Sequence, residues 1–236
     1  MKTKHSFVLI TPLLLLFASQ APLSLVYAEE QPFYTQTNEA KGILIKAPAS
    51  VDPKALRAAG AIVSAMLQQD DIATRMHARK AALAIIPRNV FMTALPEFAY
   101  LHGKKDPNNN AYDSFAVRGG GGIRTQPVTA AAEENLLHLK GDAWAAENTT
   151  YHEFAHGIMN LGFSKEQLHR WRDIYKTARQ RNLFPGAFAM KNAAEYWAEL
   201  TQSFFGVNNE INGAAFIKER DPIAYEFLES VYRPKK

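Results

Sequence analysis

One short segment, residues 151–157, constrains the fold more than any other part of the chain. It contains the pattern H-E-x-x-H, with its histidines at His152 and His156 and its glutamate at Glu153. Residues four apart in a helix lie one turn apart on the same face. Two imidazoles at this spacing can therefore converge on one metal ion. The fold must place a helix here and bring a further ligand to it from elsewhere in the chain.

The same pattern indicates a chemistry. Zn²⁺ suits two histidines on one helix face, and it lowers the pKa of a bound water towards about 7. Glu153 lies between the two histidines, so its carboxylate can take a proton from that water and later give it to a leaving amine. The alternative is a surface helix with two unrelated histidines. The apolar neighbours Phe154 and Ala155 favour a half-buried helix and a metal site.

A catalytic zinc site also needs a third protein ligand and an open fourth position. The pattern H-E-x-x-H-x-x-G-x-x-H is excluded because Met159 and Gly162 occupy its last two defined positions, and the chain has no cysteine. The remaining candidate for the third ligand is a carboxylate from a later helix. The best candidate segment is 192–199, where Glu195 and Glu199 lie one helical turn apart. One of them can bind the metal while the other accepts the N–H of a ligating histidine.

Two alternatives to this assignment stay open. Glu195 can form a capping box, with Asn192 as the N-cap and Glu195 at the third position of the helix. Glu166 is a second carboxylate that competes for the place of third ligand. A capping role predicts that loss of Glu195 costs about 1 kcal/mol of stability, whereas a ligand role predicts loss of the metal.

The two segments together resemble the gluzincin group of zinc peptidases, in particular the peptidase domain of anthrax lethal factor and the clostridial Pro-Pro endopeptidases. Those proteins carry H-E-F-G-H on one helix and an N-x-x-E-F-F-A-E-like segment on a later one, which residues 152–156 and 192–199 match here. The resemblance implies one Zn²⁺ per chain, held by His152, His156 and Glu195. It also implies Glu153 as the general base and Glu199 as a residue that supports a ligating histidine.

Four sequence blocks extend the resemblance to an uncharacterised group of zincin-like proteins from bacteria and fungi. In chain order the blocks are R-G-x-G-G, E-E-N-L-L, H-E-F-A-H and E-Y-W-A-E, at residues 118–122, 133–137, 152–156 and 195–199. Four blocks in the same order are far more specific than H-E-x-x-H alone.

One position departs from the gluzincin pattern. Lethal factor has a tyrosine seven residues before its ligand glutamate, with a role in stabilising the oxyanion, and Phe188 occupies that place here. Loss of such a donor lowers the rate about 10²–10³-fold. The candidates to replace it are Tyr151, Tyr175, Tyr196 and His169. The departure motivates an alternative function, a zinc-binding exported interaction protein with weak or no catalytic activity. A third hypothesis is an amidase that acts on cell-wall peptides.

The N-terminus has the features of a secretory signal peptide. Two lysines precede an apolar run over residues 7–18, and a small-residue cleavage site ends at Ala28. The run is short for a membrane anchor and Pro12 interrupts it. We therefore expect cleavage after Ala28 and a mature catalytic domain over residues 29–236. The protein would then be secreted or periplasmic, without stable membrane association.

Composition limits the remaining possibilities. The chain has 236 residues and is 47% hydrophobic, which suits one globular domain. The net charge of +4 falls to about +2 without the two lysines of the signal peptide, and there is no Lys/Arg stripe, so nothing points to nucleic acid. The absence of cysteine excludes disulfides and a cysteine nucleophile. The predicted partner is a peptide or protein substrate.

The hydrophobic periodicity predicts an α+β domain of the zincin-like type: a small mixed sheet, then an active-site helix and a mainly helical C-terminal part. After a polar lead-in over residues 29–41, the predicted strands are 42–47, 81–86 and 135–139. The predicted helices are 55–69, 72–80, 142–162, 164–182, 192–205 and 221–232. Asp142 is the expected N-cap of the active-site helix, and the four glycines at 119–122 are expected to form a turn with unusual backbone angles. Residues 134–139 are either a core strand or an edge strand to which a peptide can add.

Overall fold

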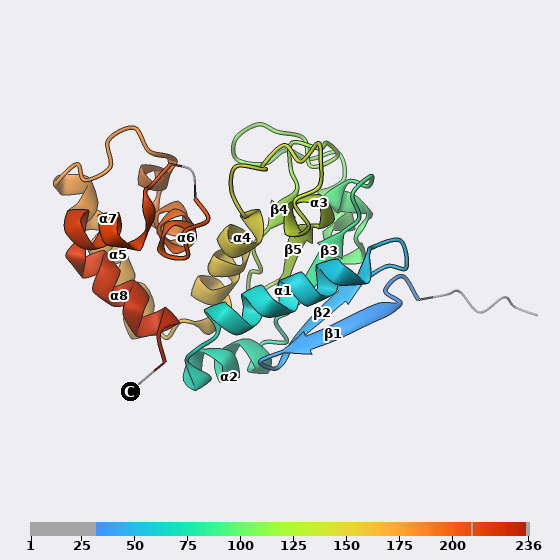
Figure 1. The fold of residues 1–236 in the computed structure, drawn as a ribbon, viewed down its shortest axis with the longest axis horizontal. Helices are drawn as coiled ribbons and strands as arrows, with labels where there is room; N and C mark the ends of the chain where they lie inside the picture. The colour runs from blue at the N-terminus through green and yellow to red at the C-terminus, as the bar shows by residue number, and fades with distance from the viewer. Residues whose placement is uncertain (1–31, 209, 235–236) are drawn as a thin grey trace, which may run out of the picture. The chain divides into compact units, whose positions relative to one another are not determined.

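A five-stranded mixed sheet forms the N-terminal half of the fold (Figure 1). The computed structural model describes residues 32–208 and 210–234, so the expected signal peptide lies outside the described residues. In spatial order the strands are β1 (Gln36–Ala40), β2 (Ile43–Ala47), β3 (Ala82–Ile86), β5 (Val128–Ala132) and β4 (Gly119–Gly120). The three central strands β2, β3 and β5 are parallel, and the edge strands β1 and β4 pair antiparallel to them.

The central strands β3 and β5 are buried on both faces because a different layer covers each face. Leu83, Ile85 and Ala131 belong to the larger core, which also contains the apolar faces of helices α1 (Pro53–Met66) and α4 (Thr149–Gly157). Their neighbours along the strands point the other way. Those neighbours pack in a smaller core under the 3₁₀ helices η1 (Met92–Ala94) and η2 (Pro96–Leu101).

The C-terminal half is helical. It comprises α5 (Lys165–Gln180), η4 (Phe188–Lys191), α6 (Ala193–Phe204), α7 (Gly213–Arg220) and α8 (Pro222–Tyr232). Its centre is a cluster of buried aromatic rings: Trp171, Tyr196, Trp197 and Phe227. Figure 1 shows α4 between the sheet and these helices. The Trp197 indole N–H donates to the Ala155 carbonyl of α4 at 2.8 Å, so the helix with the second candidate segment is fixed against the helix with the first.

The predicted fold class is confirmed, and most of the predicted elements exist. The helix expected at 55–69 is α1, which begins at Pro53 because the Asp52 side chain caps it by accepting from the Lys54 N–H at 2.8 Å. The next helix is α2 (Asp70–Ala78). The strands expected at 42–47 and 81–86 are β2 and β3. The helix α7 has no counterpart among the predicted elements.

Two predictions in the sheet region are wrong. Residues 36–40, expected as part of a polar lead-in, form strand β1. Their polar side chains fit an edge strand because Gln36 donates to the Pro48 and Val51 carbonyls and Asn38 donates to the Leu56 carbonyl. The strand expected at 135–139 does not exist, since the short helix α3 (Glu133–Leu136) and a turn occupy this stretch.

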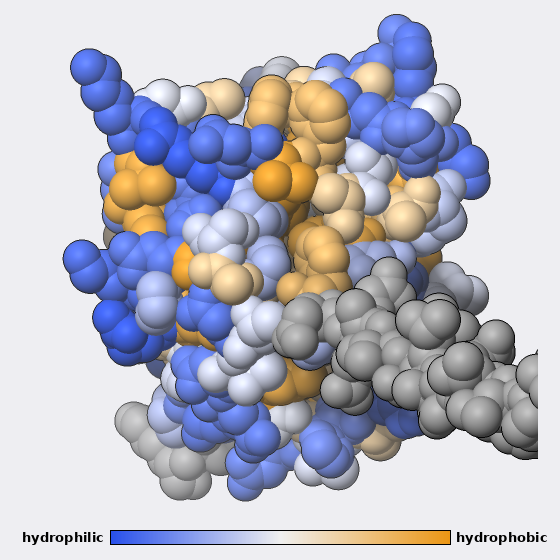
Figure 2. Space-filling view, turned by 90° about the vertical axis from the view of Figure 1, so that its right-hand side faces the viewer, coloured by the Kyte–Doolittle hydropathy of each residue, from blue (hydrophilic) through white to orange (hydrophobic). Residues whose placement is uncertain are grey.

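None of the helices in the described part of the chain is both long enough and apolar enough to cross a bilayer. On the face drawn in Figure 2, hydrophobic residues form a central band bordered by hydrophilic ones. More than half of the accessible surface of an ordinary folded protein is contributed by apolar atoms, so we assign no role to this band.

Candidate metal centre

The helix α4 carries His152, Glu153 and His156, as predicted, but it begins later than expected. Asn148 is its N-cap and accepts from the Thr150 N–H at 3.1 Å. The expected N-cap, Asp142, lies outside the helix and accepts from the Asn135 side chain at 2.8 Å. After Gly157 the chain continues as a π-helical turn, η3 (Ile158–Gly162), so the helical stretch ends at Gly162, as the sequence predicted.

The four glycines at 119–122 bring the edge of the sheet onto α4. A Cβ at Gly119 would lie 2.7 Å from the Glu153 Cγ, and one at Gly121 would lie 2.3 Å from the His156 Cβ. None of these glycines has a positive φ, so the prediction of a turn with unusual backbone angles is wrong. The glycines are required because the backbone of one element approaches the side chains of another. The Gly121 N–H also donates to the Glu153 carboxylate.

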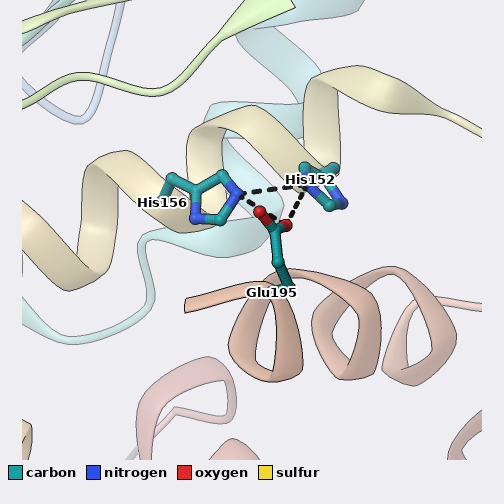
Figure 3. A group of neighbouring side chains, drawn as sticks. All are labelled: His152, His156 and Glu195. Carbon is teal, nitrogen blue, oxygen red and sulfur yellow. Dashed lines mark hydrogen bonds and ion pairs between the residues drawn. The ribbon is translucent and has the colours of Figure 1, made fainter. Parts of the chain in front are cut away.

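Three side chains from two helices point to one place (Figure 3). His152 and His156 reach it from α4, and Glu195 reaches it from α6. The two histidine Nε2 atoms lie 3.1 Å apart. The Glu195 Oε2 atom lies 3.2 Å from the Nε2 of His152 and 3.4 Å from that of His156. Three atoms with lone pairs thus form a triangle with nearly equal sides.

This triangle fits a metal ion. Nitrogen and oxygen ligands lie about 2.0–2.1 Å from a tetrahedral Zn²⁺, which places the ligand atoms roughly 3.3–3.4 Å from one another. Glu195 Oε2 is also buried and has no well-aligned hydrogen bond with any described residue. A buried carboxylate oxygen in that state needs a cation. Two histidines and one carboxylate form a donor set that catalytic zinc sites use.

A second layer of polar side chains lies behind His152. The His152 Nδ1 is 3.1 Å from Glu199 Oε1 and 3.2 Å from Gln202 Oε1. Because both neighbours are oxygen acceptors, Nδ1 carries the proton and Nε2 keeps a lone pair for a metal. Asn208 donates to the other Glu199 oxygen at 2.6 Å. Gln202 was missed in the sequence, although it lies three residues after Glu199 on the same face of α6.

The charges of these groups are coupled. Burial raises the pKa of Glu195, but the close contacts with the two histidines and their charges outweigh burial and hold it well below its usual range. Burial lowers the pKa of His152, but Glu195 and Glu199 outweigh this effect and raise it well above its usual range. Burial raises the pKa of Glu153, which brings that carboxyl closer to the neutral range where a general base works best.

The triangle lies in the wall of a cavity of about 910 Å³. Glu153 and the glycines of β4 line the same cavity. So does Phe188, whose side chain is 42% exposed, at the position where the resemblance leads one to expect a tyrosine. An open space of this size beside three candidate ligands leaves room for water and a bound peptide segment.

Other residues singled out in the sequence lie elsewhere. Asn192 caps α6 by accepting from the Glu195 N–H at 3.0 Å, but the Glu195 side chain turns to the histidines and does not complete a capping box. Glu166 lines a different cavity, beside α5 and the start of α8. The four candidates to replace the missing hydroxyl do not line the cavity at the triangle: Tyr151, Tyr175, Tyr196 and His169.

Sequence reasoning also missed the role of the block at 133–135. These three buried polar residues each fix a different loop. Glu133 accepts from the backbone N–H groups of Asp52 and Arg88 at 2.7 and 3.0 Å. Glu134 forms a two-pronged buried ion pair with Arg118, the residue before β4, at 2.6 and 2.9 Å.

Asn135 accepts from the Thr149 N–H at 2.8 Å and donates to the Glu147 carbonyl at 3.0 Å. The block thereby holds both β4 and the start of α4 beside the triangle.

Comparison with known proteins supports the fold. No family model and no curated protein matches the chain. Among solved structures, a Pro-Pro endopeptidase from Paenibacillus alvei matches with a TM-score of 0.56 and 16% sequence identity. The match covers 80% of this chain and 97% of that one. At this identity the likeness shows the fold alone.

Proposed function

We propose that the protein is a zinc-dependent metallopeptidase that hydrolyses peptide bonds in a peptide or protein substrate. The observation that carries the proposal is the triangle of His152, His156 and Glu195 atoms, whose sides measure 3.1–3.4 Å, in the wall of a large cavity. Glu153 lines the same cavity. The likeness of the fold to a Pro-Pro endopeptidase supports the same function.

In this proposal each residue has a defined task. A bound Zn²⁺ supplies a water of lowered pKa and polarises the substrate carbonyl. His152, His156 and Glu195 hold it, and Glu199 fixes the orientation of His152 through Nδ1. Glu153 takes a proton from the attacking water and delivers it to the nitrogen of the leaving amine as the C–N bond breaks.

The edge of the sheet supports a peptide as substrate. Strand β4 pairs with β5 on one side, and no strand of the described part of the chain pairs with its other side. An extended peptide can add to such a free edge through backbone hydrogen bonds. The segment expected to offer an edge, residues 134–139, is not a strand, so β4 takes this place in the proposal. The lack of a side chain at Gly119 lets the backbone of this edge lie directly against Glu153, since a Cβ there would lie 2.7 Å from the Glu153 Cγ.

We also propose export. The support is the sequence of the N-terminus alone: two lysines, an apolar run and a small-residue cleavage site ending at Ala28. Cleavage after Ala28 gives a secreted or periplasmic enzyme. Mass determination of the protein recovered outside the cytoplasm tests this point, and a mature N-terminus at Glu29 is the expected result.

The alternative is a zinc-binding exported protein that cleaves nothing. The observation that favours it is Phe188, which lines the cavity without offering a hydroxyl. A peptidase and a cell-wall amidase share the same site chemistry, so profiling on proteins, peptide libraries and cell-wall peptides is needed to distinguish them. The retained Glu153 beside the triangle favours a catalytic role, because a structural zinc site needs no base.

The test combines zinc content and cleavage of a peptide library for the wild type and three variants. We expect about one zinc per chain in the wild type, consistent with a single mononuclear site. Glu153→Ala keeps the zinc and stops cleavage, whereas Glu195→Ala loses the zinc. Glu166→Ala, a carboxylate of the other cavity, serves as control and changes neither property. Zinc without cleavage in the wild type supports the binding protein, and a wild type that binds no zinc contradicts the proposal.

A further inference from the structure

Hydrolysis of an amide is faster when a hydrogen-bond donor assists the metal at the carbonyl oxygen. As water attacks, the π electron pair of the carbonyl moves onto its oxygen, and a donor aimed at that oxygen accelerates the reaction about 10²–10³-fold. Phe188 cannot supply the donor. The hydroxyls of Tyr175 and Tyr196 are occupied, since they donate to the Met190 carbonyl at 2.9 Å and to Asp221 at 2.7 Å.

Most donors on the cavity wall are also occupied. The Arg118 guanidinium binds Glu134 and nearby backbone carbonyls. Gln126 donates to the Glu97 carbonyl at 2.8 Å, and Gln202 to the Asn148 carbonyl at 3.0 Å. Among the described side chains that line the cavity, the donors without a hydrogen bond to the protein belong to Tyr100, Asn108, Tyr112 and Trp144.

Tyr112 differs from the other three residues in the exposure of its side chain. The side chains of Tyr100, Asn108 and Trp144 are exposed, whereas Tyr112 is half-buried. Its ring packs against the smaller core below the sheet. Its backbone N–H donates to the Lys104 carbonyl at 3.0 Å, next to a β-bridge between Lys105 and Ala111. A ring held in this way carries its hydroxyl at a fixed position, which an oxyanion donor requires.

The electrostatics agree with this geometry. Burial raises the pKa of Tyr112, and the negative charges of Asp106 and Glu153 add to the effect. The hydroxyl therefore stays protonated and able to donate throughout the neutral range. Glu153 lines the same cavity as Tyr112.

We propose that the Tyr112 hydroxyl donates a hydrogen bond to the carbonyl oxygen of the scissile bond and stabilises the oxyanion that forms there. The inference rests on the proposed peptidase function. Oxygen from water bonds to the carbonyl carbon, the π pair moves to the carbonyl oxygen, and Tyr112 donates without giving up its proton. When the oxyanion collapses, the C–N bond breaks and the amine receives the proton carried by Glu153.

The test is Tyr112→Phe, with Tyr100→Phe as the matched control on the same cavity wall. We expect kcat to fall about 10²-fold in Tyr112→Phe, with KM, zinc content and melting temperature unchanged. A second readout does not depend on turnover. The affinity for a phosphinic peptide, whose tetrahedral phosphorus group resembles the oxyanion, falls by a similar factor, while the affinity for the peptide product is unchanged. Tyr100→Phe changes neither quantity.

Failure of this inference differs from failure of the proposed function. If Tyr112→Phe keeps both kcat and phosphinic-peptide affinity while Glu153→Ala keeps zinc and loses cleavage, Tyr112 is not the donor and the peptidase function stands. If the wild type cleaves no substrate, the proposed function fails. The phosphinic-peptide affinity then still decides whether Tyr112 recognises a tetrahedral oxyanion, because equal affinities of wild type and Tyr112→Phe contradict that role.

Discussion

Gly121 lies directly against His156, and it can do so because glycine has no side chain. A Cβ at position 121 would lie 2.3 Å from the Cβ of His156, far inside the 3.0 Å below which Cβ contacts are essentially never found. The backbone at the end of β4 therefore sets how closely the sheet approaches the second histidine of the triangle. His156 cannot move aside easily, because the contact is with its first side-chain atom.

This contact predicts the effect of the substitution Gly121→Ala. The added methyl group forces β4 and α4 apart, and such overpacking costs about 1–3 kcal/mol. It also displaces His156 from Glu195, so we expect zinc affinity to fall at least about tenfold, as it does when supporting residues of metal sites are changed. Zinc titration and thermal unfolding measure the two effects.

Gly120→Ala, at the last residue of β4 and next to Gly121, is the matched control. Its added Cβ would lie 3.4 Å from the Met92 sulfur, an atom of a flexible side chain. We expect Gly120→Ala to leave zinc affinity unchanged. Equal zinc affinities for Gly121→Ala and the wild type would mean that the approach of β4 does not position His156.

Glu199→Ala tests the support of His152 from behind. The change removes the carboxylate 3.1 Å from His152 Nδ1, so the imidazole loses the charged one of its two acceptors and keeps Gln202. We expect zinc affinity to fall about 10–100-fold while the fold persists. Glu210→Ala is the control, because Glu210 lines the same cavity but accepts from the Phe188 N–H instead. An unchanged dissociation constant for Glu199→Ala refutes the supporting role.

Asn135→Ala tests the link between α3 and the start of α4. Asn135 is almost fully buried, and its loss leaves the Thr149 N–H and the Glu147 carbonyl without partners. We expect the free energy of unfolding to fall by about 2–4 kcal/mol, from the sum of two unsatisfied buried groups. Urea unfolding measures this loss.

The substitution Asn135→Asp separates the acceptor role of the Asn135 side chain from its donor role. It keeps an acceptor for the Thr149 N–H but removes the donors to carbonyl oxygens, and it adds a charge near Asp142. Native-state hydrogen exchange should then show a protected Thr149 amide in Asn135→Asp and a faster-exchanging one in Asn135→Ala. Equal exchange in the two variants contradicts the capping role of the Asn135 oxygen.

The local part of the candidate site could be read from the sequence. His152 and His156 lie one turn apart in a stretch that is apolar enough to form a half-buried helix, and Glu195 and Glu199 repeat this spacing on α6. Helical periodicity fixes which residues share a face, so both sets of side chains were predictable. Periodicity does not say which two helix faces meet. The meeting of α4 and α6 depends on packing between distant segments, such as the hydrogen bond from Trp197 to Ala155.

The wrong predictions share a cause. A run of glycines indicates positive φ when only local geometry is considered, but Gly119 and Gly121 have negative φ and lack a side chain because α4 lies against them. The apolar end of the block at 133–137 suggested a strand, whereas its polar start binds three loops and folds as α3. In both places a contact with a distant segment decides the local structure, and the sequence of one segment does not contain that information.

Glu97 makes stability depend on pH. It accepts from the Lys46 ammonium and the Tyr34 hydroxyl. Burial raises the pKa of Glu97, but these hydrogen bonds outweigh burial, so the pKa lies below its usual range. A carboxyl with a depressed pKa in the folded state stabilises the fold above its unfolded pKa of about 4.3, and this contribution is lost as the pH falls through the folded value.

We therefore expect Glu97→Gln to lower the free energy of unfolding by on the order of 1 kcal/mol near neutral pH. The difference from the wild type should shrink as the pH falls from about 4 through the lowered pKa of folded Glu97, because the wild-type carboxyl then becomes protonated and resembles the amide. Urea unfolding across this range measures both quantities, and Glu39→Gln, an exposed position in β1, is the matched control. A Glu97→Gln deficit that persists at acid pH would show that the side chain stabilises the fold by packing and not by its charge.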